Sequence, residues 1–271
     1  CDDLTSVSSL LNEINKNFRY IIVMRNPVDL LFTWFRSGRG DRLGKDPRYT
    51  NPAFIVKKFD NIHYFELSAY YPKLSNQPIR EEYLLSGKLE TTNDAYAIAK
   101  IAGLKMCEAY NKQYKLNYIC LMPTNLYGPN DNYDLKNSHF FPALLKKIYR
   151  AKKEKKKYIK IWGNGKSKRE LMNVYDLAEA CEFFLKKNTK HTVINIGTGK
   201  EKTIKEFCYY IMKKLNCNLK IKFDKSKPNG TPRKILNCNI AKSYGWISKI
   251  SLDKGFKMTF ENFIENYNKF N

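Results

Sequence analysis

Residues 93–114 read NDAYAIAKIAGLKMCEAYNKQY, a stretch that predicts an amphipathic α-helix. Apolar side chains recur in it at helical spacing, no proline interrupts it, and Asn93 is a suitable N-cap. In such a helix Tyr96 and Lys100 lie one turn apart on one face. A lysine ammonium group lowers the pKa of a nearby tyrosine from its usual value of about 10. The pair could therefore exchange a proton with a substrate carbonyl, although an isolated Tyr-x-x-x-Lys spacing more often marks a surface pair.

The composition describes a folded, strongly basic chain. It has 271 residues, 43% of them hydrophobic, with 49 Lys and Arg against 26 Asp and Glu, a net charge of +23. Such a charge suits anionic partners. The excess is mostly lysine and no nucleic-acid-binding motif accompanies it, so a compositional bias explains it better than nucleic-acid binding does. We expect no nucleic-acid partner, whereas a nucleotide diphosphate fits the charge.

Cysteine and histidine usage argues against metal and disulfide sites. The seven cysteines include no C-x-x-C pair, and the three histidines share no ligand spacing. No signal peptide and no apolar run of about 18 residues is found. We therefore expect no metal, no membrane partner and a reducing, cytoplasmic setting.

Strand-length apolar runs alternate with helical patterns along the chain, which predicts an α/β fold with a mainly parallel sheet. The segment PTNLYGP, residues 123–129, directly follows one such run, at the position where open α/β sheets bind ligands. The expected strands are residues 117–122, 158–162, 192–196 and 219–223. The expected helices are residues 140–153, 174–185, 203–215 and one that begins at Leu252. A turn is expected at residues 225–234.

The N-terminal part has a different character. A strand at residues 20–24 and a helix at residues 28–35 enclose Arg25, in the segment RNPVDLLFTWFRSGRGDRLG. This segment resembles the 3′-phosphate-binding segment of sulfotransferases, in which Arg25 and either Thr33 or Ser37 would contact the phosphate. A solvated arginine on a strand-helix unit explains the pattern equally well.

From Tyr71 onward the chain is similar to the GDP-L-fucose synthases, a family of extended short-chain dehydrogenases/reductases. The resemblance rests on seven motifs in the family's order: YPKLSNQPIREEYLLSGKLE, AYAIAKIAGLKMCEAYNKQY, MPTNLYGPNDNY, NSHFFPALL, WGNGKSKRE, INIGTG and SKPNGTPRK. It implies a partial Rossmann-like, doubly wound parallel sheet followed by a smaller α/β substrate domain. The implied regions are a sulfotransferase-like segment 1–66, the remainder of a dinucleotide-binding domain 67–150, and a nucleotide-sugar domain, mainly 151–271.

The resemblance also implies an activity. GDP-4-keto-6-deoxy-D-mannose would be epimerised at C3 and C5 and reduced at C4 with NADPH to give GDP-L-fucose, and the family suggests a homodimer. Tyr96 would protonate the C4 oxygen, and His139 would serve the epimerisation. Lys100 would tune Tyr96 and contact the cofactor, which would be lined by Pro123, Thr124, Asn125, Leu126 and His139. The substrate would meet Lys147, Trp162, Arg169, Arg233 and Lys234.

Three departures from the family pattern affect this expectation. The glycine-rich cofactor turn is not found upstream of Tyr71, because Gly38, Gly40 and Gly44 follow a helix with the wrong spacing. The family's Ser-Ser-Cys run is replaced by residues 67–69. There Leu67 takes the catalytic serine position with Ser68 beside it, and Ala69 takes the cysteine position.

Because the departures coincide near residues 65–70, they indicate a fusion junction. We expect weak or absent turnover. The alternative is a non-catalytic GDP-sugar-binding protein, or a fusion fragment that carries part of a sulfotransferase.

Overall fold

The computed structural model describes residues 70–91, 94–135, 138–226 and 230–270, except the side chains of Tyr96, Lys269 and Phe270. The expectations for Arg25, Thr33, Ser37 and Ser68, and for the strand and helix of the N-terminal segment, lie outside the described residues. Within the described part, no helix combines the length and apolar character needed to cross a membrane.

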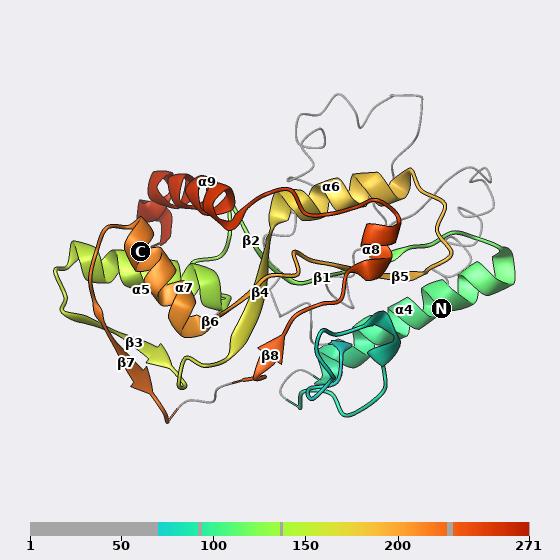
Figure 1. Ribbon diagram of the computed structural model, residues 1–271, viewed down its shortest axis with the longest axis horizontal. Helices are drawn as coiled ribbons and strands as arrows, with labels where there is room; N and C mark the ends of the chain where they lie inside the picture. Colours follow the sequence, from blue (N-terminus) through green and yellow to red (C-terminus); the bar gives the residue numbers. More distant parts are fainter. Residues whose placement is uncertain (1–69, 92–93, 136–137, 227–229, 271) are drawn as a thin grey trace, which may run out of the picture.

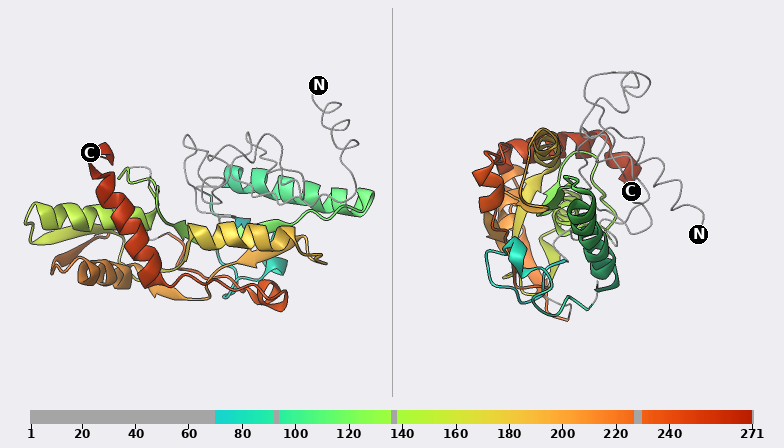
Figure 2. Two further views of the ribbon diagram at one scale, coloured as in Figure 1. Left: turned by 90° about the horizontal axis from the view of Figure 1, so that it is seen from above. Right: turned by 90° about the vertical axis from the view of Figure 1, so that its right-hand side faces the viewer.

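A short parallel sheet lies between two helices on one side of the molecule (Figures 1 and 2). Strand β1 (Cys120–Pro123) pairs in parallel with β5 (Val193–Ile196). Helix α4 (Asp94–Tyr114) covers one face of this pair and α6 (Val174–Leu185) covers the other. This is the doubly wound arrangement that the sequence predicted, in which a parallel sheet is covered on both faces.

The side chains of β1 alternate between these two faces. Cys120 and Met122 belong to the hydrophobic cluster that includes Ile101 and Leu104 of α4. Ile119 and Leu121 point the other way, into the cluster formed with Leu177 and Phe184 of α6. The alternation follows from the two-residue repeat of a strand, and it decides which side chains of β1 face α4 and which face α6. Helix α8 (Asn239–Ser243) joins the second cluster through Ala241.

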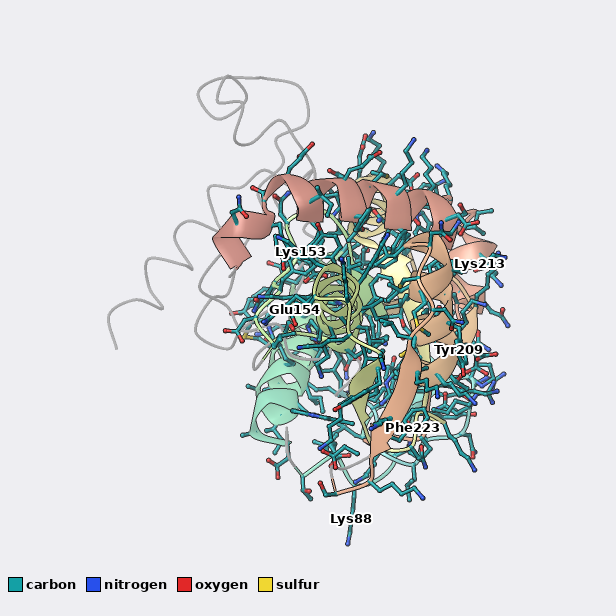
Figure 3. The ribbon with its side chains drawn as sticks, turned by 90° about the vertical axis from the view of Figure 1, so that its left-hand side faces the viewer. Lys88, Lys153, Glu154, Tyr209, Lys213 and Phe223 are labelled. Carbon is teal, nitrogen blue, oxygen red and sulfur yellow. The ribbon has the colours of Figure 1, made fainter. Side chains whose placement is uncertain are left out.

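A second group of elements surrounds a separate aromatic core. Helices α5 (Phe140–Lys153), α7 (Ile204–Lys214) and α9 (Leu252–Glu265) pack with the parallel strands β3 (Tyr158–Trp162) and β7 (Lys220–Asp224). Figure 3 shows this side of the molecule, with Lys153 at the end of α5 and Lys213 at the end of α7. Helices α5 and α7 thus both carry lysines in their last turn, where cations interact favourably with the helix dipole.

Strand β4 (Lys168–Asn173) connects the two groups. It pairs in parallel with β2 (Asn125–Tyr127) and β8 (Arg233–Lys234), and antiparallel with β6 (Glu201–Thr203). Two 3₁₀ helices, Glu81–Tyr83 and Tyr267–Phe270, complete the described elements. The segments from three distant parts of the sequence therefore meet along one strand.

Most predicted elements are confirmed. Helices 140–153 and 174–185 and strand 158–162 have the predicted bounds. The predicted strand 117–122 instead begins at residue 120, because the Asn111 side chain bonds both backbone polar groups of Tyr118. This contact replaces the ladder hydrogen bonds that a longer strand would need.

The structure corrects two loop predictions in part. Residues 125–127 of PTNLYGP form β2, and residues 233–234 of the predicted turn 225–234 form β8. Both are too short to show the apolar run by which a buried strand is recognised, and β8 consists of two basic residues. They become strands because β4 supplies their backbone partners.

The packing also bears on the predicted division of the chain at residue 150. Most of helix α5 lies before residue 150, but most residues of its hydrophobic cluster lie after it. Conversely, β5 and α6 lie after residue 150 but pack with β1, which lies before it. The hydrophobic clusters therefore do not separate at that residue. The boundaries at residues 66 and 150 stay predictions about functional regions.

Candidate functional site

Helix α4 carries Lys100 into the interior. Its side chain is only 3% exposed, although lysine is among the residue types that are least often buried. The backbone of Tyr96 lies one turn earlier on the same helix, while its side chain lies outside the described residues. Because Lys100 is buried, the Tyr-x-x-x-Lys spacing does not mark a pair of solvated surface residues.

The segment after β1 forms a polar edge beside this helix. The Thr124 backbone N–H donates to the Ile196 carbonyl at 2.9 Å, which continues the pairing with β5. The side chains of Thr124 and Asn125 both donate to the backbone carbonyl of Glu170, at 3.3 and 3.0 Å. Asn125 is buried, and its Oδ1 has no hydrogen-bond partner among the described residues. A buried acceptor of this kind suits a donor on a bound molecule.

His139 occupies the N-cap position of α5. Its backbone is extended, with φ −61° and ψ 162°, and its carbonyl accepts a hydrogen bond from the Ala143 N–H at 3.1 Å. The imidazole is half-buried and does not cap the helix. The ring therefore stands at the start of a 14-residue helix, where the exposed N–H groups favour negative charge.

Lys147 and Trp162 contact each other between α5 and β3. The Lys147 Nζ lies 5.4 Å from the centroid of the Trp162 ring, within cation–π range. Burial lowers the pKa of Lys147, and the nearby Cys208 opposes this shift. Trp162 itself is 56% exposed. The pair thus combines a partly desolvated cation with an accessible aromatic face.

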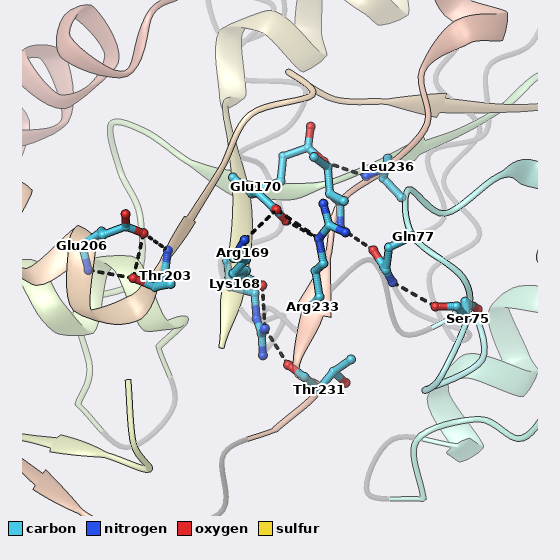
Figure 4. Close-up of polar contacts among 12 residues, drawn as sticks. Ser75, Gln77, Lys168, Arg169, Glu170, Thr203, Glu206, Thr231, Arg233 and Leu236 are labelled. Atoms are coloured by element: carbon cyan, nitrogen blue, oxygen red, sulfur yellow. Dashed lines mark hydrogen bonds and ion pairs between the residues drawn. The ribbon is translucent and has the colours of Figure 1, made fainter. Parts of the chain in front are cut away.

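Arg169, Arg233 and Lys234 are joined by the pairing of β4 with β8, in which Arg169 lies opposite Lys234. The Arg169 Nη1 donates to the carbonyls of Thr231 at 2.7 Å and Lys168 at 2.8 Å (Figure 4). The Arg233 Nε donates to both carboxylate oxygens of Glu201, at 2.8 and 3.0 Å. Arg169 and Lys234 are buried, so the paired strands β4 and β8 each place one cation inside the protein.

The predicted site residues thus fall into two contacting groups. Residues 124–125 reach Arg169, Arg233 and Lys234 through β4, and Lys147 contacts Trp162. Lys100 lies on α4, and His139 lies at the N-cap of α5.

Glu170, which lies at the centre of the first group, was missed by sequence reasoning. Its position inside the motif WGNGKSKRE gave no indication of a role. Among the described residues no cluster of three or more His, Cys, Asp or Glu side chains could hold a metal ion.

Comparison with known proteins agrees with this architecture. A model of the NAD dependent epimerase/dehydratase family matches residues 56–197, more than half of the chain. The GDP-L-fucose synthase of Sinorhizobium fredii is 47% identical over 199 residues, which are 73% of this chain and 63% of that protein. The GDP-L-fucose synthase of Escherichia coli is 43% identical over 212 residues, 75% of this chain and 66% of that protein.

A solved structure has the same arrangement of elements. The crystal structure of a GDP-L-fucose synthetase from Naegleria fowleri bound to NADP has a TM-score of 0.68 and 26% sequence identity. The match covers 74% of this chain and 64% of that one, so this chain spans less than two thirds of these relatives. The fold is the α/β, Rossmann-like arrangement of parallel strands and helices, and the chain belongs to the NAD dependent epimerase/dehydratase family.

Proposed function

We propose that the chain acts as a GDP-L-fucose synthase-like enzyme, which epimerises GDP-4-keto-6-deoxy-D-mannose at C3 and C5 and reduces it at C4. The observation that carries this proposal is the burial of Lys100 on α4, one helix turn after Tyr96. The curated relatives of the same family, including those of S. fredii and E. coli, support the choice of substrate.

The proposed proton transfers use Tyr96, Lys100 and His139. Lys100 favours the phenolate of Tyr96, so that Tyr96 gives its proton to the C4 oxygen during reduction. The same hydrogen bond stabilises the enolate that forms when a proton leaves C3 or C5. His139, at the N-terminus of α5, removes and returns those protons. In the sequence Ser68 follows Leu67, which takes the position of the family's catalytic serine, and Ser68 would assist in its place.

NADPH supplies the hydride when it is bound. The residues present fit its nicotinamide half, because Lys100 is a buried donor and the Asn125 Oδ1 is a buried acceptor with no partner among the described residues. Pro123, Thr124, Leu126 and His139 would line this part of the site. The described residues do not include a glycine-rich turn for the pyrophosphate, so we expect weak cofactor binding.

The cationic residues suit the diphosphate of a GDP-sugar. Arg169 and Lys234 are buried on adjacent strands, Arg233 follows at the same edge, and Lys147 is held over Trp162. Buried or half-buried cations gain more from pairing with phosphate than solvated ones do, because the local dielectric is lower. By family resemblance we further propose a cytoplasmic homodimer.

The catalytic proposal is tested with purified protein, NADPH and GDP-4-keto-6-deoxymannose. We expect slow oxidation of NADPH, measured by absorbance, and loss of this activity in Tyr96→Phe. The matched variant Tyr114→Phe, on the last turn of α4 and exposed, should keep the wild-type rate. NADPH oxidation no faster than in Tyr96→Phe would contradict the catalytic proposal.

A second candidate is a protein that binds the GDP-sugar without reducing it. The replacement of the family's Ser-Ser-Cys run by Leu67, Ser68 and Ala69 favours it. Calorimetry separates the two: GDP binding without NADPH binding supports the second candidate, and binding of both supports the enzyme. A parallel titration with adenosine 3′,5′-bisphosphate tests the sulfotransferase-like segment, and the absence of heat would remove that expectation.

A further inference from the structure

Glu170 is a fully buried acid that the proposed reaction does not use. Its side chain is 0% exposed, and it lies on β4 next to Arg169. Acidic residues are almost never fully buried unless their oxygens are paired, because an unpaired carboxylate in the interior is costly. The partners of this carboxylate therefore indicate what it holds.

One carboxylate oxygen of Glu170 holds the loop after β5. Its Oε1 accepts the backbone N–H groups of Thr198 at 2.6 Å and Gly199 at 2.7 Å, and the Thr198 hydroxyl at 3.3 Å. This loop stands at the carboxyl end of a parallel strand, next to Thr124, whose N–H bonds the last residue of β5. Carboxyl ends of such strands are where α/β proteins bind their ligands.

The other oxygen holds the chain that leaves β8. The Glu170 Oε2 accepts the Leu236 N–H at 2.8 Å, two residues after Lys234 (Figure 4). From the opposite side the Gln77 Oε1 accepts the Ile235 N–H at 3.0 Å. The segment that carries Arg233 and Lys234 is therefore fixed at its C-terminal end by two side chains from distant parts of the sequence.

The backbone of Glu170 completes the connection. Its carbonyl oxygen is the acceptor shared by the Thr124 and Asn125 side chains. One residue thus touches the segment proposed for the nicotinamide, the loop after β5 and the strand proposed for the diphosphate. Charge-assisted hydrogen bonds to backbone N–H groups are short and about twice as strong as neutral ones, so the carboxylate can set these positions accurately.

We propose that Glu170 is a positioning residue of the nucleotide-sugar site, which holds β8 and its cations Arg233 and Lys234 in register for the diphosphate. The inference rests on the proposed function. It assigns Glu170 no contact with the substrate. Its effect passes through Leu236 to β8 and through Thr198 and Gly199 to the end of β5.

Glu170→Gln tests the inference with little change in volume. The glutamine amide keeps one acceptor oxygen and replaces the other with an NH₂ donor. Either the N–H groups of Thr198 and Gly199 or that of Leu236 would then face a donor instead of an acceptor. We expect GDP, titrated by calorimetry into the full chain, to bind about tenfold more weakly or worse. Glu170→Asp keeps the charge and both oxygens, and should retain more affinity than Glu170→Gln.

The matched control is Glu179→Gln. Glu179 is a carboxylate on α6 that also bonds a distant part of the sequence with both oxygens. It accepts the Trp246 Nε1–H at 2.6 Å and the Lys249 Nζ at 2.6 Å. Its two side-chain partners lie on neither β4 nor β8. We expect it to lower the melting temperature while leaving the dissociation constant of GDP within a factor of two of the wild type.

The outcomes separate the inference from the function on which it rests. Unchanged GDP affinity in folded Glu170→Gln overturns the positioning role and leaves the proposed function standing. An equal loss in Glu179→Gln also overturns it, because general destabilisation would then explain the effect. Wild-type protein that does not bind GDP overturns both. If Glu170→Gln does not fold, wild-type GDP affinity in Glu170→Asp despite faster amide exchange at Leu236 overturns the inference, because the anchor would then be loosened without effect on binding.

Discussion

Gly197 lies directly against the carboxylate of Glu170, with no room for a side chain between them. A Cβ at this position would collide with the Glu170 Oε1 and would lie 3.3 Å from the Cys238 sulfur. Gly197 does not have a positive φ, so its requirement is space and not backbone conformation. The close approach is what allows the next two N–H groups to reach the carboxylate.

Gly197→Ala should therefore destabilise the protein by about 3 kcal/mol, because the methyl group must push a paired carboxylate out of place. Gly199→Ala is the control. Gly199 has φ +69° but open space around its Cβ, so only the backbone cost of about 1 kcal/mol is expected. Urea unfolding of the two variants measures the difference, and equal losses would contradict the steric explanation.

Thr203 caps helix α7 and gives a second prediction. Its hydroxyl accepts the Glu206 N–H at 3.1 Å while the Glu206 carboxylate accepts the Thr203 N–H at 2.6 Å, a capping box. Thr203→Ala removes one half of this arrangement and should cost about 1 kcal/mol of unfolding free energy. Thr203→Ser keeps the hydroxyl and should be nearly neutral. Chemical denaturation distinguishes them, and an equally destabilised serine variant would refute the capping role.

The sequence predicted helix α7 better than it predicted the site. Thr203, the helix periodicity and the lysines near its end are local signals, and so are those of α5 and α6. Strand β8 has no such signal, because Arg233 and Lys234 become a strand only where β4 pairs with them. Glu170 could not be recognised for the same reason, since its partners lie 28 to 66 residues away in the sequence.

The predicted site residues show the same limit. Lys100 and Tyr96 were found because one helix turn relates them, and the burial of Lys100 supports the prediction. Their relation to Arg233 or Trp162 depends on tertiary packing that no spacing in the sequence reveals. The family motifs placed these residues in one site by resemblance, and the described contacts connect only some of them.

The pair of Arg233 and Glu201 should make stability depend on pH. The hydrogen bond from the Arg233 guanidinium lowers the pKa of Glu201, so its ionised form stabilises the folded state. This contribution is fully present above the ordinary carboxyl pKa of about 4.3 and is lost as the pH falls through the lowered folded value.

Glu201→Gln should therefore reduce the unfolding free energy by about 0.5–1 kcal/mol at pH 7, and the difference should shrink as the solution is acidified. Thermal unfolding at several pH values measures it. Glu182→Gln, which breaks an exposed pair with Lys186, is the control and should change little. A difference that persists unchanged in acid would contradict the ionic origin.

The contact between Lys147 and Trp162 can be measured with a double-mutant cycle. Lys147→Met and Trp162→Leu, alone and together, should give a coupling energy of about 0.5–1 kcal/mol in unfolding experiments. On α7 the Lys205 Nζ lies 5.7 Å from the centroid of the exposed Tyr209 ring, and this pair should give a smaller coupling energy. Strictly additive effects of the first pair would show that the ring does not stabilise the lysine.

Strand β4 places residues of opposite charge side by side in the sequence. Arg169 turns toward the carbonyls of Thr231 and Lys168, and Glu170 turns toward three backbone N–H groups. Because neighbouring side chains of a strand point to opposite faces, sliding β4 by one residue would bring a guanidinium against donors and a carboxylate against acceptors. A one-residue slip of this strand thus sets like against like, and electrostatic repulsion disfavours that alignment while the chain folds.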